Sequence, residues 1–177
     1  MKIFLLTHER ELHRGTNTGS LAIDDSSGCD IVERILWERV NPNKPLINLI
    51  ENNEALLLYS KGESSSAVSS TVSSSESSAM SSVNSSAISS ISIQDYENII
   101  IIDGTWQESQ KIFNHSPYLK DAPKFTLKTT NDSLYKLRAN QPKGGLCTIE
   151  CIIEVLKMKG QDKIASALSV KFEQFNH

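Results

Sequence analysis

Residues 98–106 read Asn-Ile-Ile-Ile-Ile-Asp-Gly-Thr-Trp, and this stretch decides the fold class. The four consecutive isoleucines form a short, continuous apolar run, which is typical of a strand buried on both faces of a sheet. Gly104 then allows a tight turn, and Thr105 begins a predicted helix that extends to about Asn114. A buried strand that leads directly into a helix favours an α/β fold with parallel strand pairing.

The rest of the chain repeats this alternation of short apolar runs and helical stretches. Residues 30–40 place Ile31, Ile35 and Leu36 on one side and charges on the other, which predicts an amphipathic helix. The other predicted elements are strands over 2–7, 55–59, 124–128 and 134–138, a helix over 148–158 that Gly160 ends, and a final helix from about residue 162. At 177 residues, the chain is expected to form one domain over residues 1–177 with a mainly parallel sheet.

A low-complexity, Ser-rich segment over residues 64–93 interrupts this pattern. From Ser65 to Ser92 the chain repeats Ser-Ser-x-x without a break. A four-residue period advances about 40° per repeat on a helix, so an apolar stripe would wind around the axis and could not stay buried. We therefore predict a flexible insert without chemistry, with a multiply phosphorylated regulatory tract as the alternative.

The cysteines and histidines do not predict a metal site. The three cysteines, Cys29, Cys147 and Cys151, form no C-x-x-C pair, and His8 and His13 are five residues apart without a third ligand nearby. Cys147 and Cys151 share one helix face, where cysteine is usually a small hydrophobic residue; a catalytic thiol is the weaker alternative. No metal cofactor is expected.

Composition and charge exclude some partners. The longest early apolar run, Ile3 to Leu6, is shorter than the roughly 7–15 residues of a signal-peptide core, so we expect a cytoplasmic protein without a membrane partner. The net charge of −3 gives no general attraction to nucleic acid. Residues 104–146 nevertheless hold seven Lys/Arg against three Asp/Glu, which is either a local basic surface or an ordinary solvated one.

The functional site is expected where the strands end, because ligands of open α/β sheets bind beyond the carboxyl ends of the strands. Four segments would meet there, namely residues 7–19, 59–61, 103–106 and 143–148. Asp103 has two interpretations that the spacing does not separate: a residue of this site, or the N-cap of the helix that follows.

Six short motifs together resemble the DTW-domain family in order and spacing. They are Thr7-His8 with Glu11 and Thr16-Asn17-Thr18-Gly19, then Leu57-Leu58-Tyr59, Asp103-Gly104-Thr105-Trp106-Gln107, Ser116-Pro117 with Leu119, Tyr135-x-Leu137-Arg138, and Leu146-x-Thr148-x-Glu150. The resemblance covers nearly all of the chain outside the Ser-rich insert. It implies a SPOUT-like, knotted α/β fold.

The resemblance also implies an activity. Members of the family are tRNA-uridine aminocarboxypropyltransferases, which transfer the 3-amino-3-carboxypropyl group of S-adenosylmethionine to N3 of a uridine in tRNA and release methylthioadenosine. The implied partners are thus tRNA and S-adenosylmethionine, the latter as co-substrate. Two alternatives remain: a SPOUT-type RNA methyltransferase and a catalytically silent RNA-binding module.

Roles for individual residues follow from the same resemblance. Asp103 is the candidate general base, with Thr105 and Trp106 as the other catalytic candidates; Trp106 is either a wall of the site or a packed core aromatic. The residues expected to contact S-adenosylmethionine are Asn17, Leu58, Tyr59, Gly104, Leu146, Cys147 and Thr148. The residues expected to face RNA phosphates are Arg10, Arg14 and Arg138.

The insert hypothesis is tested by deletion. Replacing Ser65–Ser92 with a short Gly/Ser loop should leave folding and binding of S-adenosylmethionine intact, because a surface loop tolerates a change of length at little entropic cost. Thermal melting and calorimetric titration of the deleted and full-length proteins measure this. A large drop in melting temperature would show that the tract packs against the domain.

Overall fold

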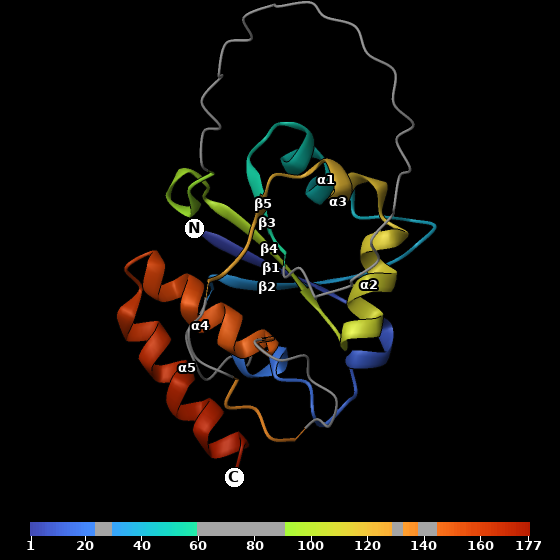
Figure 1. Cartoon of the computed structure of the whole chain (residues 1–177). Coiled ribbons are helices and arrows are strands. Elements are labelled where there is room, and N and C mark those ends of the chain that lie inside the picture. Colours follow the sequence, from blue (N-terminus) through green and yellow to red (C-terminus); the bar gives the residue numbers. More distant parts are fainter. Residues whose placement is uncertain (24–29, 60–90, 129–132, 138–144) are drawn as a thin grey trace, which may run out of the picture.

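Five parallel strands form one sheet in the computed structural model of the chain, which describes residues 1–23, 30–59, 91–128, 133–137 and 145–177. The strands are β1 (Lys2–Thr7), β2 (Val32–Leu36), β3 (Ala55–Leu58), β4 (Asn98–Asp103) and β5 (Lys124–Phe125). Their order across the sheet is β2-β1-β4-β3-β5, and every pairing is parallel (Figure 1). The predicted α/β domain with a parallel sheet is confirmed.

Helices cover both faces of this sheet (Figure 1). One face carries α4 (Thr148–Met158) and α5 (Asp162–Phe175); the other carries α1 (Lys44–Glu51), α2 (Trp106–Asn114) and α3 (Pro117–Asp121). Short 3-10 helices are η1 (Glu9–Glu11), η2 (Gly19–Ala22) and η4 (Ile93–Asp95). Two hydrophobic clusters result, one on each face, which explains the continuous isoleucine run of β4.

The pleat of β4 determines which face each side chain meets. Ile99 and Ile101 lie in the cluster of the α4–α5 face, whereas Ile100 lies in the cluster of the other face. The same period of two carries Asp103 onto the α4–α5 face. In β1, Thr7 is the residue paired with Asp103, at the carboxyl end of both strands.

Helix caps account for two of the helix boundaries. Thr105 and Glu108 form a capping box at the start of α2. Asn43 caps α1 by accepting a hydrogen bond from the Leu46 backbone N–H (2.9 Å), and a proline lies in the first turn.

The predicted helix over residues 30–40 is wrong, because this segment contains β2. The spacing of Ile31 and Ile35 fits a helix, but the segment pairs with the open edge of β1, and Ile35 packs with Trp37 on the α1–α3 face. Tertiary pairing therefore overrides the local pattern. The predicted strand over 124–128 is reduced to two residues, and residues 134–137 form no strand. The short helices α1 and α3 were not predicted.

Most of the predicted insert, residues 64–90, lies outside the described residues. Ile93, its last residue, is buried in the cluster of the α4–α5 face. Within the described ranges, no helix has both the length and the apolar character needed to cross a bilayer.

Candidate active site

A buried carboxylate lies at the carboxyl end of the sheet. Asp103 is 1% exposed, and the Arg34 guanidinium lies 3.7 Å from its Oδ2 atom. The cap of α2 is Thr105, so the N-cap interpretation of Asp103 is wrong. Asp103 accepts side-chain hydrogen bonds from Thr7 (3.1 Å) and Asn17 (3.0 Å) on Oδ2 and from Thr148 (2.9 Å) on Oδ1.

The amide of Asn17 connects Asp103 to its surroundings. Its Nδ2 donates both to Asp103 and to Glu11 Oε2 (3.0 Å). Its Oδ1 accepts from the Ser20 backbone N–H (2.8 Å), the Ser20 hydroxyl (3.0 Å) and Arg34 (3.3 Å). These bonds leave the amide a single orientation and hold the loop between β1 and η2 against the sheet.

A series of charged side chains, Glu11, Arg14 and Glu108, connects the Asn17 amide to Thr105, two residues after the end of β4. Arg14 donates to the fully buried Glu11 and lies 3.6 Å from Glu108. Glu108 accepts from the Thr105 backbone N–H (2.9 Å) and hydroxyl (2.8 Å). Burial opposes ionisation of Glu108, but these Thr105 donors, the Glu11 side chain and the Arg14 charge lower its pKa to about 2. The carboxylate is therefore ionised at neutral pH.

The N-terminus of α4 completes the enclosure of Asp103. Thr148, the first residue of α4, donates to Asp103, and the Ile149 backbone N–H donates to the Thr18 hydroxyl (3.3 Å). The loop after β1 and the start of α4 are thus joined directly. Segments separated by more than 100 residues meet at one carboxylate.

Glu150 holds the segment that precedes α4. Its carboxylate accepts from the backbone N–H groups of Cys147 (2.8 Å) and Leu134 (2.7 Å) and from the Ser133 hydroxyl (2.5 Å). The Tyr135 hydroxyl then donates to the Thr16 carbonyl oxygen (2.6 Å). The glutamate and tyrosine of the last two sequence motifs therefore support the walls around Asp103.

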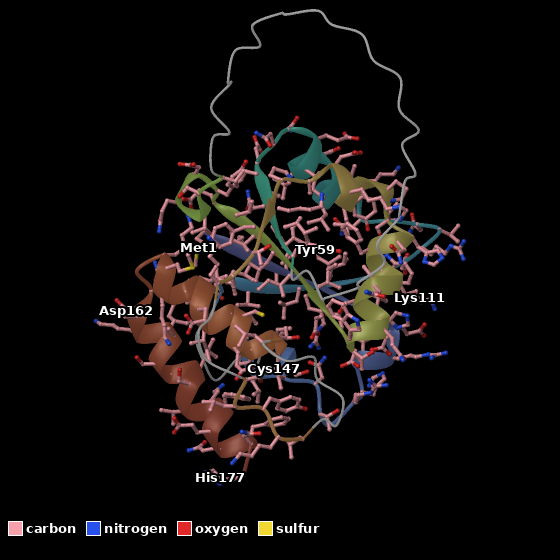
Figure 2. The ribbon with its side chains drawn as sticks, in the orientation of Figure 1. Met1, Tyr59, Lys111, Cys147, Asp162 and His177 are labelled. Atoms are coloured by element: carbon pink, nitrogen blue, oxygen red, sulfur yellow. The ribbon has the colours of Figure 1, made fainter. Side chains whose placement is uncertain are left out.

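The residues expected to contact S-adenosylmethionine fall into three groups. Asn17 and Thr148 bind Asp103 directly. Leu58, Gly104, Leu146 and Cys147 lie in segments at the strand ends or at the start of α4. The Tyr59 ring instead packs on Phe113 of α2, with ring centroids 4.8 Å apart, in the cluster of the opposite face. Figure 2 labels Tyr59 near the centre of the molecule and Cys147 at the start of α4.

Trp106 is the first residue of α2 and is half-buried. Among the described residues, it belongs to neither hydrophobic cluster. This position argues against a packed core aromatic, and a role as a wall of the site stays a prediction.

The three arginines expected at RNA differ in their surroundings. Arg10 is exposed, and its side chain has no partner in the part of the chain that the structure describes. Arg14 is engaged by two carboxylates, so its charge is compensated within the protein. Arg138 lies outside the described residues.

Arg34 is a site residue that the sequence reasoning missed, because its segment was assigned to a helix. If residues 32–36 are taken as a strand, Arg34 lies on the same face as Val32, which is the α4–α5 face that also carries Asp103. The Arg34 Nε–H group is buried, and among the described residues it has no hydrogen-bond acceptor. An unsatisfied buried donor beside Asp103 is a candidate contact for a ligand acceptor.

The two described cysteines are not activated thiols. Burial, followed by the negative charge of Glu150, raises the pKa of Cys147 and raises that of Cys151 to about 12. Both are therefore protonated at neutral pH, which favours the small-hydrophobe interpretation over a catalytic thiol.

A matched pair of glycine substitutions tests the packing around Asp103. A Cβ at Gly19 would lie 2.9 Å from Asp103 Cγ and from both carboxylate oxygens, whereas a Cβ at Gly15 would meet nothing within 4 Å. Gly19→Ala should lower the free energy of unfolding by roughly 1–3 kcal/mol, and Gly15→Ala should change it little. Urea denaturation measures both; equal stability of the two variants would contradict the close packing of Gly19.

Comparison with known proteins gives one assignment. No solved structure matches the chain. The model of one family, described as the DTW domain, matches residues 1–177, which is the entire chain. Of the motif residues, Thr7, Asn17 and Thr148 are the ones that donate hydrogen bonds to Asp103. The chain belongs to the DTW-domain family.

Proposed function

We propose that the protein transfers the 3-amino-3-carboxypropyl group of S-adenosylmethionine to N3 of a uridine in tRNA. The DTW-domain family is a family of tRNA-modifying enzymes, which supports a role in tRNA modification. The observation that carries the specific proposal is the convergence of β1, the loop that follows it and α4 on the Asp103 carboxylate, at the edge of the sheet where α/β proteins bind ligands.

The described residues at this edge fit S-adenosylmethionine. Half-buried Trp106 and Leu146, both outside the core clusters, offer apolar surface to the adenosine. The buried Arg34 Nε has no acceptor in the described part of the chain, and the carboxylate of the amino acid moiety would satisfy it. Asn17 is already fully engaged and is therefore proposed to position Asp103 rather than to contact S-adenosylmethionine.

When bound, S-adenosylmethionine supplies an electrophilic carbon attached to a positively charged sulfur. Uridine N3 carries a proton at neutral pH and needs a base to become nucleophilic. A carboxylate has about four acceptor positions, and three of those on Asp103 are occupied. The open position is on Oδ1, and we propose that it takes the N3 proton as the N3–C bond forms and the C–S bond breaks.

The neighbours of Asp103 hold this acceptor in place. Thr7 and Asn17 fix Oδ2, and Thr148 fixes Oδ1, so the open position has a defined direction. Such positioning selects which carbon is attacked, because attack requires close approach and alignment of the reacting atoms. A SPOUT-like, knotted course of the backbone is part of the same proposal. Two segments that lead to α4, residues 129–132 and 138–144, lie outside the described residues.

Product analysis tests the proposed reaction. Purified protein, unmodified tRNA and S-adenosylmethionine should yield methylthioadenosine together with an aminocarboxypropylated uridine, both measured by liquid chromatography and mass spectrometry. Formation of S-adenosylhomocysteine and a methylated nucleoside would instead establish the methyltransferase alternative. Binding of tRNA with neither product would favour the catalytically silent RNA-binding module.

The role of Asp103 is tested by Asp103→Asn. The amide would place an N–H group against one of the donors that now face the carboxylate, and it removes the proton acceptor. We expect a loss of roughly 1–3 kcal/mol in stability and a fall in turnover of more than tenfold at saturating S-adenosylmethionine. The control Asp121→Asn makes the same change of charge at an exposed residue of α3. Retention of more than about a tenth of the wild-type rate would remove Asp103 from the reaction.

A further inference from the structure

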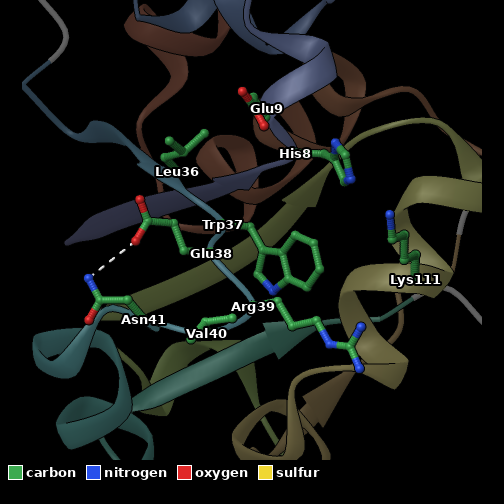
Figure 3. Close-up of a pocket in the computed structure, with 9 residues that line it drawn as sticks. All are labelled: His8, Glu9, Leu36, Trp37, Glu38, Arg39, Val40, Asn41 and Lys111. Carbon is green, nitrogen blue, oxygen red and sulfur yellow. Dashed lines mark hydrogen bonds between the residues drawn. The ribbon is translucent and has the colours of Figure 1, made fainter.

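A second concave site lies on the opposite face of the same sheet edge. It is a cavity of about 470 Å³ between the end of β1, the segment after β2 and helix α2 (Figure 3). Its lining includes His8, Trp37, Arg39 and Lys111. We call it the His8–Trp37 pocket, after the two rings that stack at its base with centroids 5.6 Å apart.

The charges of this pocket are unevenly placed. Arg39 and Lys111 lie on one side of Trp37, whereas the acidic lining residues Glu9 and Glu38 lie toward Leu36 (Figure 3). Glu38 there accepts a hydrogen bond from Asn41 (3.2 Å). Neither Arg39 nor Lys111 forms an ion pair with any residue that the structure describes. Two uncompensated cations at one end of a cavity are suited to an anion.

Apolar surface forms another part of the pocket. Leu36 is 40% exposed and Val40 is 94% exposed, although both are aliphatic. The orientation of the Trp37 indole is fixed by a hydrogen bond that its Nε1–H donates to the Ser116 hydroxyl (2.9 Å). A flat, partly apolar group can therefore contact this surface while an attached anion reaches the cations.

The tautomer of neutral His8 is determined by its own backbone. His8 Nδ1 accepts a hydrogen bond from the Arg10 backbone N–H (3.2 Å), so in the neutral ring the proton is on Nε2. In the described parts of the chain, Nε2 has no hydrogen-bond partner. His8 thus lines the pocket with a donor that a ligand can use.

The pocket is joined to the Asp103 site through the backbone. The His8 backbone N–H donates to the Asp103 carbonyl oxygen (3.3 Å), and Thr7, the preceding residue, donates from its side chain to the Asp103 carboxylate. Because successive side chains of an extended chain point to opposite faces, Thr7 meets the α4–α5 face and His8 meets the α2 face. One pocket wall is therefore one residue away from the proposed reaction centre.

We propose that the His8–Trp37 pocket binds one nucleotide of the RNA substrate next to the target uridine. The phosphate lies against Lys111 and Arg39, the His8 Nε2–H donates to the nucleotide, and the base contacts Leu36, Val40 and the rim of Trp37. The inference rests on the proposed function in that it takes RNA as the substrate, but it can be tested without turnover.

Tryptophan fluorescence gives a direct test. The chain has two tryptophans, so Trp106→Phe leaves Trp37 as the only reporter. Uridine, cytidine and adenosine 5′-monophosphates should quench this signal, and the corresponding nucleosides should bind more weakly because they lack the phosphate. In the same background, His8→Asn keeps an acceptor for the Arg10 N–H but removes the Nε2–H donor, which an asparagine side chain is too short to replace. This variant should bind nucleotides roughly tenfold more weakly. Absence of quenching, or equal affinity of nucleosides and nucleotides, would overturn the proposal.

A second test uses unmodified tRNA and measures the dependence of its affinity on salt. Arg39→Ala/Lys111→Ala should lower the slope of log affinity against log salt by about 0.7, since both cations contact the same phosphate and each single-strand phosphate contact contributes about 0.7. The control Lys157→Ala/Lys163→Ala removes the same charge from exposed residues of α4 and α5 on the opposite face. Equal slopes for the two double variants would overturn the pocket assignment.

The two proposals fail separately. If methylthioadenosine forms but the pocket variants bind nucleotides and tRNA like the wild type, the pocket assignment is wrong and the reaction stands. If no methylthioadenosine forms but the pocket variants lose nucleotide affinity and salt dependence, the reaction is wrong and the pocket stands.

Discussion

The structure depends on keeping one buried carboxylate supplied with hydrogen-bond donors. Asp103 lies at the end of an apolar strand, where an unsatisfied polar group would cost about 1–3 kcal/mol or more. Its donors come from β1, from the following loop and from α4. The loop must therefore pass close to the strand end, which Gly19 permits by lacking a Cβ. The position of α4 is likewise set by a polar contact, with the apolar faces of α4 and α5 providing the larger buried area.

The pleat of the sheet then distributes two kinds of chemistry over two faces. On the α4–α5 face, the carboxylate is enclosed by hydroxyl, amide and guanidinium groups, which suits a small molecule and a proton transfer. On the α2 face, an aromatic pair lies beside exposed cations, which suits a nucleotide and its phosphate. Thr7 and His8 are adjacent in the chain and serve one face each. Under the two proposals, a substrate that reaches around this edge contacts both faces.

The sequence predicted elements whose signal is local and missed those that depend on distant partners. The isoleucine run of β4 and the helix that begins at Thr105 are readable within a few residues, and both are confirmed. β2 was mistaken for a helix, because only the open edge of β1 makes its segment a strand. Helix α1 is an exception, because its start signal is local: Asn43 is its N-cap and Pro45 lies in its first turn, yet no helix was predicted there. The neighbourhood of Asp103 could be predicted from the strand ends, but the contact with Arg34 could not, since it depends on the misassigned strand.

The internal pairing of Arg14 changes where RNA contacts are expected. A guanidinium between Glu11 and Glu108 is needed to compensate two carboxylates, one of them fully buried, and removing it would leave those charges unpaired. This structural role limits the availability of Arg14 to an RNA phosphate. Among the described residues near the proposed reaction centre, Arg10 after β1 and the pair Arg39 and Lys111 in the pocket have no ion-pair partner. Because the net charge of the chain is −3, attraction of RNA has to come from such a local group of cations and not from the molecule as a whole. Compensation of the buried carboxylates and the proposed attraction of RNA thus depend on different cations at the same edge of the sheet.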